Sequence, residues 1–184
     1  MKLPNFFCLL DTEFTAWKGS QENNWSKEGE EKEIIQISAM KIIYKNSRFE
    51  ILDKFNIFVK PKINPILSDY IMELTGITNE KIKKKGISFN KAIDKLYNFC
   101  SHNNKLLNVY SYGNDFHIIE NNLILNCYEK NHKFYKWNVN HFDLRKILIE
   151  KNIPVDNYSS GTLYKHFNID LVSDVHNSEW DVLS

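Results

Sequence analysis

A chain of 184 residues is long enough for one domain with a buried core. Hydrophobic residues make up 42% of it and aromatic residues 14%, which predicts a globular fold and excludes a disordered chain. The formal net charge of +1 neither favours nor excludes a nucleic-acid partner, because a nearly neutral protein can still carry one basic face.

Cysteine spacing and the lengths of the apolar segments argue against a secreted or membrane-spanning protein. Cys8, Cys100 and Cys127 are too few and too scattered for a disulfide framework, and none forms a CxxC pair. The apolar run Phe6–Leu10 is too short for a signal-peptide core, and no stretch is long enough to cross a bilayer. We therefore expect one cytoplasmic domain over residues 1–184 that does not bind membranes.

The first third of the chain predicts three strands and one long loop. Asn5–Leu10 is apolar and predicts a buried strand that ends at the acids of Asp11-Thr12-Glu13. Residues 17–32 are polar and rich in Gly, Ser, Asn and Glu, which indicates a loop that is either a substrate lid or a surface insertion. Glu33–Tyr44 and Phe49–Val59 predict two strands joined as a hairpin by the short link between them.

Helices alternate with strands in the rest of the chain. Ser68 is a good N-cap for a helix that Gly76 ends, and Ser88 opens another helix that runs to about Cys100. Further elements are predicted as a strand at Leu106–Tyr110, a helix from Asp115, a last strand at Phe134–Val139, and helices at Asp143–Glu150, at Ser160–Phe167 and from Ser178. An early hairpin followed by strand–helix units predicts an α/β fold with a mixed sheet and excludes a purely parallel one.

Asp11 and Glu13 are the first pair of residues that could carry chemistry. Residues two apart in a strand point to the same face, so both carboxylates would project from one side. Two neighbouring acids are costly unless a cation neutralises them, and oxygen ligands suit hard ions such as Mg²⁺ or Mn²⁺. The alternative is an ordinary solvated turn at a strand end.

Two later clusters contain similar groups. Asp115 follows a predicted strand and Gly113, where it would be either a metal ligand or a helix N-cap. His176 and Asp181 lie close together near the last residues, and the ordinary pKa of histidine, about 6.5, suits proton abstraction from water. The alternative for this pair is a surface histidine and a surface acid.

Taken together, these clusters resemble the DEDDh exonucleases, the DnaQ-like proofreading and RNA-trimming family with a ribonuclease H-like fold. Asp11 and Glu13 in the string DTEFT are similar to the first motif of the family, and Asp115 in YGNDF to its second. His176 and Asp181, spaced HxxxxD, are similar to its third motif. The resemblance implies a five-stranded mixed sheet, antiparallel in its hairpin and parallel elsewhere, flanked by helices.

The resemblance extends from about Phe6 to Asp181 and is closest to the Eri-type RNA-trimming branch. The strings EIIQISA, FVKP and ELTGIT also look like segments of that branch. Membership would imply 3′→5′ hydrolysis of single-stranded nucleic acid, RNA favoured over DNA, with release of nucleoside 5′-monophosphates. Asp11, Glu13, Asp115 and Asp181 would hold two Mg²⁺ or Mn²⁺ ions, with His176 as general base.

The resemblance also implies substrate contacts. The backbone around Phe14 and Thr15 would meet the terminal sugar, and Leu74 and Thr75 would lie against the last base. Lys81 and Lys83–Lys85 would either attract the phosphate backbone or form a solvated helix end.

The sequence departs from the family pattern at its last residues and leaves other functions open. Only three residues follow Asp181, and Val182 stands where the family favours a small residue. A short last helix would anchor Asp181 poorly, so one alternative is a weak or inactive module of the same fold that binds nucleic acid or acts as a scaffold. A proofreading subunit of a polymerase is another alternative, and the sequence does not identify any protein partner.

Overall fold

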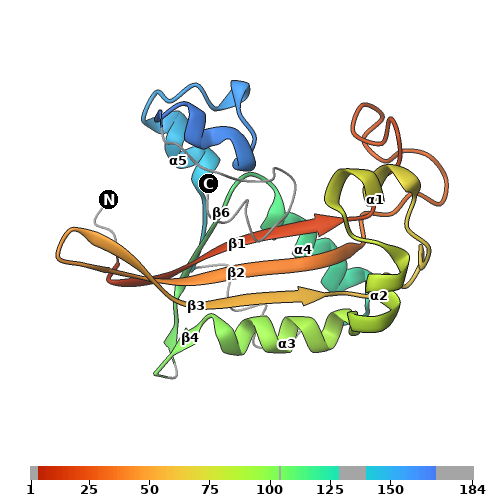
Figure 1. Ribbon diagram of the computed structural model, residues 1–184, viewed down its shortest axis with the longest axis horizontal. Helices are drawn as coiled ribbons and strands as arrows, with labels where there is room; N and C mark the ends of the chain where they lie inside the picture. Colours follow the sequence, from red (N-terminus) through yellow and green to blue (C-terminus); the bar gives the residue numbers. More distant parts are fainter. Residues whose placement is uncertain (1–3, 104, 129–139, 169–184) are drawn as a thin grey trace.

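A five-stranded mixed sheet forms the centre of the molecule, with the strand order β3-β2-β1-β6-β7 (Figure 1). The computed structural model describes residues 4–103, 105–128 and 140–168. The strands are β1 (Phe6–Phe14), β2 (Ile34–Lys45), β3 (Arg48–Phe58), β6 (Asn108–Ser111) and β7 (His141–Asp143). Two short strands, β4 (Ser101–His102) and β5 (Lys105–Leu106), pair separately.

The helices surround this sheet. They are α1 (Asp69–Thr75), α2 (Asn79–Lys85), α3 (Phe89–Phe99), α4 (Asp115–Leu125) and α5 (Leu144–Glu150). Two 3₁₀ segments follow, η2 (Val155–Asn157) and η3 (Ser160–Lys165). None of the helices in the described ranges is both long enough and apolar enough to cross a membrane.

The central strand β1 has both antiparallel and parallel neighbours, which confirms the predicted mixed sheet. β1 pairs antiparallel with β2, and β2 pairs antiparallel with β3 as a hairpin. On its other side β1 pairs parallel with β6, and β6 pairs parallel with β7. β6 ends at Ser111, which pairs with Leu10, so the chain that leaves β6 begins beside the last residues of β1.

Alternate residues of β1 belong to two different hydrophobic clusters. Cys8 and Leu10 pack with residues of α3 and α4, whereas Phe7 and Leu9 pack with residues of α5. Figure 1 accordingly shows α3 and α5 on opposite sides of the sheet. Burial on both faces explains why the first part of this strand is a continuous apolar run.

Several predicted elements differ from the observed ones. β1 extends to Phe14, so Asp11 and Glu13 lie within the strand, because Thr12 and Glu13 still pair with residues of β2. The predicted helix at Ser160–Phe167 is the 3₁₀ segment η3. The strand β7 and the lysine-rich helix α2 were not predicted, since each is short. The predicted strand at Phe134–Val139 and the helix from Ser178 lie outside the described residues.

A buried glutamate ties the chain before β2 to the segment that leads into α1. The Glu33 side chain is almost fully buried, and its carboxylate accepts hydrogen bonds from the backbone N–H groups of Lys62, Ile63 and Asn64 at 2.5, 2.8 and 2.5 Å. The Thr15 N–H donates to the Glu33 carbonyl oxygen, and the Glu33 N–H donates to the Thr15 hydroxyl oxygen at 2.9 Å. One side chain therefore fixes the turn at residues 62–64 against the end of β1.

Replacing this carboxylate by an amide tests its structural role. In Glu33→Gln one oxygen becomes an NH₂ donor that faces a backbone N–H, which leaves a buried donor without an acceptor. We expect the free energy of unfolding in urea to fall by about 1–3 kcal/mol. The exposed neighbour Glu31 serves as a control, and an equal loss in Glu31→Gln would contradict the account.

Candidate active site

Asp11 lies in β1 beside the point where β6 ends, and Asp115 follows β6 after a short turn. A turn at Gly113, with a left-handed φ of 79°, leads from β6 into α4, whose first residue is Asp115. The Asp115 Oδ1 atom accepts two hydrogen bonds from Thr12, from the backbone N–H at 3.0 Å and from the hydroxyl at 2.6 Å. These bonds fix the start of α4 against β1 at the residue that follows Asp11.

The carboxyl group of Asp115 is buried, and burial raises its pKa from 3.8 to about 7. The hydrogen bonds from Thr12 act in the opposite direction, and the nearby charge of Asp143 raises the pKa further. Burial is the largest cause because a charged carboxylate loses more hydration than a neutral carboxyl group. In the protein alone, the protonated and ionised forms of Asp115 are therefore comparably populated near pH 7, whereas an ordinary aspartate would be ionised.

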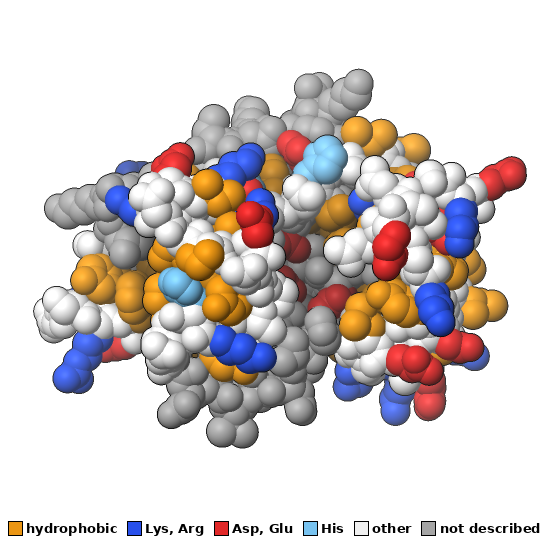
Figure 2. All heavy atoms as spheres, turned by 90° about the horizontal axis from the view of Figure 1, so that it is seen from above, with side chains coloured by type: hydrophobic (Ala, Val, Ile, Leu, Met, Phe, Trp, Pro, Cys, Tyr) orange, Lys and Arg blue, Asp and Glu red, His pale blue; other side chains and the backbone are white. Residues whose placement is uncertain are grey.

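Both acids line one cavity of about 380 Å³. Its walls come from β1, the loop after it, the β6–α4 turn and the chain before η3; the lining residues are Asp11, Phe14, Gln21, Tyr112, Asn114, Asp115, Ile118, Ser159 and Ser160. Figure 2 shows a hollow in the middle of this side of the molecule, with acidic side chains at its floor. The cavity is open to solvent and offers oxygen ligands at its base.

A second, smaller pocket of about 120 Å³ adjoins the first. Phe14 and Gln21 line both, and the remaining lining residues are Glu13, Ala16, Trp25, Tyr70, Ile71 and Leu74. Sites for drug-sized ligands usually exceed about 300 Å³, so this pocket has room only for a small group. A shift in the β1–β2 register between Glu13 and Phe14 marks a bulge here, and bulges beside active sites often redirect a side chain.

The loop at residues 17–32 forms a fixed wall of the small pocket. The Trp25 indole N–H donates to the Thr15 carbonyl oxygen at 3.0 Å, and its ring lies 5.7 Å from that of Phe14. The Lys32 ammonium group sits 4.1 Å from the centre of the indole ring. The composition of residues 17–32 predicted a loop here, but not the position of Gln21, because that position depends on the tertiary fold of the loop.

Thr15 and Thr75, which were expected near the substrate, have buried side chains; for Thr15 the expected contact was through the backbone. The Thr15 hydroxyl donates to the Glu31 carbonyl oxygen, and the side chain is buried. The Thr75 hydroxyl donates to the Ile71 carbonyl oxygen at 2.7 Å and accepts from the Ile77 N–H at 3.2 Å. These two side chains stabilise the walls of the small pocket, whereas Phe14 and Leu74 line it directly.

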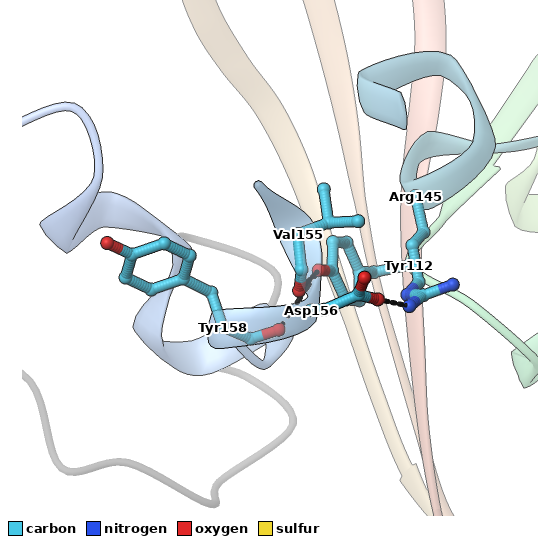
Figure 3. Close-up of polar contacts among 5 residues, drawn as sticks. All are labelled: Tyr112, Arg145, Val155, Asp156 and Tyr158. Carbon is cyan, nitrogen blue, oxygen red and sulfur yellow. Dashed lines mark hydrogen bonds and ion pairs between the residues drawn. The ribbon is translucent and has the colours of Figure 1, made fainter. Parts of the chain in front are cut away.

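Tyr112 attaches the chain around η2 to the opposite side of the cavity (Figure 3). Its hydroxyl lies 3.2 Å from the Val155 carbonyl oxygen and 3.0 Å from that of Tyr158, so one proton is shared between two acceptors. Arg145 of α5 pairs with Asp156 in the same segment. These contacts hold Ser159 and Ser160 at the cavity, a role that the sequence did not suggest.

His141 of β7 packs beneath the site. Its ring stacks on Phe116 with centroids 4.1 Å apart, and its Nε2 atom lies 2.9 Å from the Ser111 hydroxyl oxygen. Burial lowers the pKa of His141 from 6.5 to about 4; the charge of Asp143 opposes this effect, and that of Lys146 adds to it. The ring is therefore neutral at pH 7 and resists protonation on mild acidification.

The remaining predicted site residues, His176 and Asp181, lie outside the described residues. Within residues 4–103, 105–128 and 140–168, no group of three or more acidic, histidine or cysteine side chains is arranged to hold a metal ion. Asp11 and Asp115 share the large cavity, and Glu13 lines the small pocket beside it. The described part of the chain thus supplies a partial set of oxygen ligands.

Comparison with known proteins relates this arrangement to exonucleases. The RNase T family model, described as an exonuclease, matches residues 8–183. The chain is 32% identical over 105 residues to the 3′-5′ exonuclease eri1 of Schizosaccharomyces pombe, covering 55% of this chain and 31% of that protein. It is 32% identical over 77 residues to the ERI1 exoribonuclease 2 of Xenopus laevis, covering 42% of this chain and 10% of that protein. The chain spans about a third or less of the length of these relatives.

A solved structure supports the same fold. The nuclease domain of 3′hExo, a DEDDh family member bound to rAMP, superposes with a TM-score of 0.76 at 21% identity. The match covers 97% of this chain and 86% of that one. The likeness confirms the ribonuclease H-like fold that the three motifs predicted.

The shifted pKa of His141 predicts a pH-dependent stability. The unfolded chain binds the extra proton below pH 6.5 and the folded chain only below about 4, so stability falls as the pH drops through this range. The raised pKa of Asp115 has the opposite effect: between pH 3.8 and about pH 7 it makes the folded protein more stable as the pH drops. The variant compared with wild type must therefore keep Asp115, so that this contribution is the same in both proteins. We expect His141→Gln to lose less stability than wild type between pH 7 and pH 5, measured by urea unfolding.

A matched control uses the exposed His117 of α4. His117→Gln should follow the wild-type profile over the same range. Identical pH profiles for wild type and His141→Gln would contradict the neutral, buried imidazole.

Proposed function

The chain belongs to the RNase T exonuclease family, and we propose that it hydrolyses nucleic acid from the 3′ end. The proposed substrate is a single strand, RNA in preference to DNA, from which nucleoside 5′-monophosphates are released one at a time. The names of the two relatives, a 3′-5′ exonuclease and an exoribonuclease, support this direction and this substrate class. One observation carries the proposal, namely that Asp11 and Asp115 share a cavity that adjoins a small apolar pocket.

The division between the two cavities suits a terminal nucleotide. The base would enter the small pocket against Phe14 and Leu74, where contact with apolar side chains does not select one base. The scissile phosphate would then lie over Asp11 and Asp115 in the large cavity. This placement fixes the last phosphodiester bond above the acids and excludes reaction further along the strand.

The acids present fit hard divalent ions. Asp11, Glu13 and Asp115 offer only carboxylate oxygens, which are the ligands that Mg²⁺ and Mn²⁺ prefer. In the proposal these three residues and Asp181 hold two such ions, which activate water and stabilise the leaving oxygen when they are bound. Thr12 keeps the Asp115 carboxylate in place through its two hydrogen bonds. His176 accepts the proton of the attacking water.

Shortening of labelled strands tests the proposal. A 5′-labelled single-stranded RNA and its DNA counterpart are incubated with wild type in Mg²⁺, Mn²⁺ or EDTA. We expect a ladder that shortens from the 3′ end with either metal and is absent in EDTA. Asp11→Asn and Asp115→Asn should each lower the rate by about two orders of magnitude or more, since several kcal/mol of charge stabilisation are lost.

The control for these variants is Asp53→Asn, which changes an exposed acid on the edge strand β3 and should trim at the wild-type rate. The His176→Ala and Asp181→Asn variants complete the set. A folded wild-type protein that binds the RNA but shortens neither strand with either metal would overturn the proposal in favour of an inactive binding module.

A further inference from the structure

Gln21 occupies the boundary between the two cavities. It lines the large cavity together with the acids and the small pocket together with Trp25 and Leu74, and it is exposed. Phe14 also lines both, but its ring offers no hydrogen bond. Among the described residues that line both cavities, Gln21 is thus the one with a polar side chain.

The backbone of Gln21 is held by the loop around it. Ser20 is buried, and its hydroxyl accepts from the Trp17 N–H at 2.8 Å and donates to Glu30 at 3.1 Å. The backbone N–H of Trp25 donates to the Ser20 carbonyl oxygen at 2.8 Å. The backbone N–H of Asn24 donates to the Gln21 carbonyl oxygen at 3.3 Å. A side chain that projects from a fixed backbone loses less entropy on binding than one on a mobile loop.

The covalent order of a nucleotide determines what would lie at this boundary. The sugar joins the base to the phosphate, so a base in the small pocket and a phosphate over the acids place the sugar between them. Resting on the function proposed above, we propose that Gln21 hydrogen-bonds the 2′-hydroxyl of the 3′-terminal ribose and so favours RNA over DNA. A carboxamide can both donate to and accept from a hydroxyl group, which suits this contact.

The inference predicts a change in sugar preference that a general loss of structure would not give. Two RNA strands are compared, identical except that one carries a single 2′-deoxy sugar at its 3′ end. In wild type we expect a higher kcat/KM for the all-ribose strand. In Gln21→Leu the ratio of the two kcat/KM values should fall by roughly three- to tenfold, which corresponds to one lost hydrogen bond. Glu22→Leu, which changes an exposed neighbour that lines neither cavity, should keep the wild-type ratio.

A binding measurement separates this inference from the proposed function. Calorimetry with Mn²⁺ compares the affinities of AMP and 2′-deoxy-AMP for the same three proteins, and it does not require cleavage. Tighter binding of AMP to wild type and to Glu22→Leu, but not to Gln21→Leu, would support the role of Gln21. Equal affinities in wild type, or an unchanged difference in Gln21→Leu, would overturn it. If no strand is trimmed, that result counts against the proposed exonuclease activity. The difference between AMP and 2′-deoxy-AMP binding still decides the role of Gln21.

Discussion

The two hydrogen bonds from Thr12 to Asp115 are the contact on which the candidate site depends. They join the central strand to the first residue of α4, across 103 residues of sequence. Thr12 follows Asp11 directly, and Asp11 and Asp115 line the same cavity. The parallel pairing of β1 with β6 brings the end of β6 beside the last residues of β1, and the Gly113 turn completes the approach. Acidic groups distant in sequence thereby come to line one cavity.

Hydrogen bonds between distant segments fix the walls of that cavity and of the small pocket beside it. Glu33 holds the turn before α1, and α1 supplies one side of the small pocket. Trp25 anchors the 17–32 loop to the end of β1, while Tyr112 holds the chain before η3 on the opposite side. The large cavity contains Asp11 and Asp115, whereas the small pocket beside it is lined mainly by apolar side chains.

The sequence predicted those parts of the structure that have a strong local signal. The long strands were predicted correctly because their apolar residues extend over many positions. Asp11 and Asp115 were predicted as site residues because three spaced motifs support one another, and the structure places both in one cavity. The strand β7 and the helix α2 have no such signal, being three and seven residues long. Resemblance placed the Thr15 backbone and Thr75 near the substrate, and that stays a prediction; no local pattern indicated that their buried hydroxyls bond to backbone carbonyl groups. Gln21 and Tyr112 depend on contacts between distant segments, which no local pattern encodes.

Direct titration of the protein with Mn²⁺ is the sharpest test of the account, because it examines the acids without requiring a substrate. By calorimetry at pH 7, wild type should show saturable binding, and Asp115→Asn should abolish or greatly weaken it. Thr12→Val, which removes the hydroxyl bond and keeps the backbone bond, should weaken binding to an intermediate degree. No saturable binding to folded wild type, or equal binding to wild type and Asp115→Asn, would contradict a metal centre built on Asp11 and Asp115.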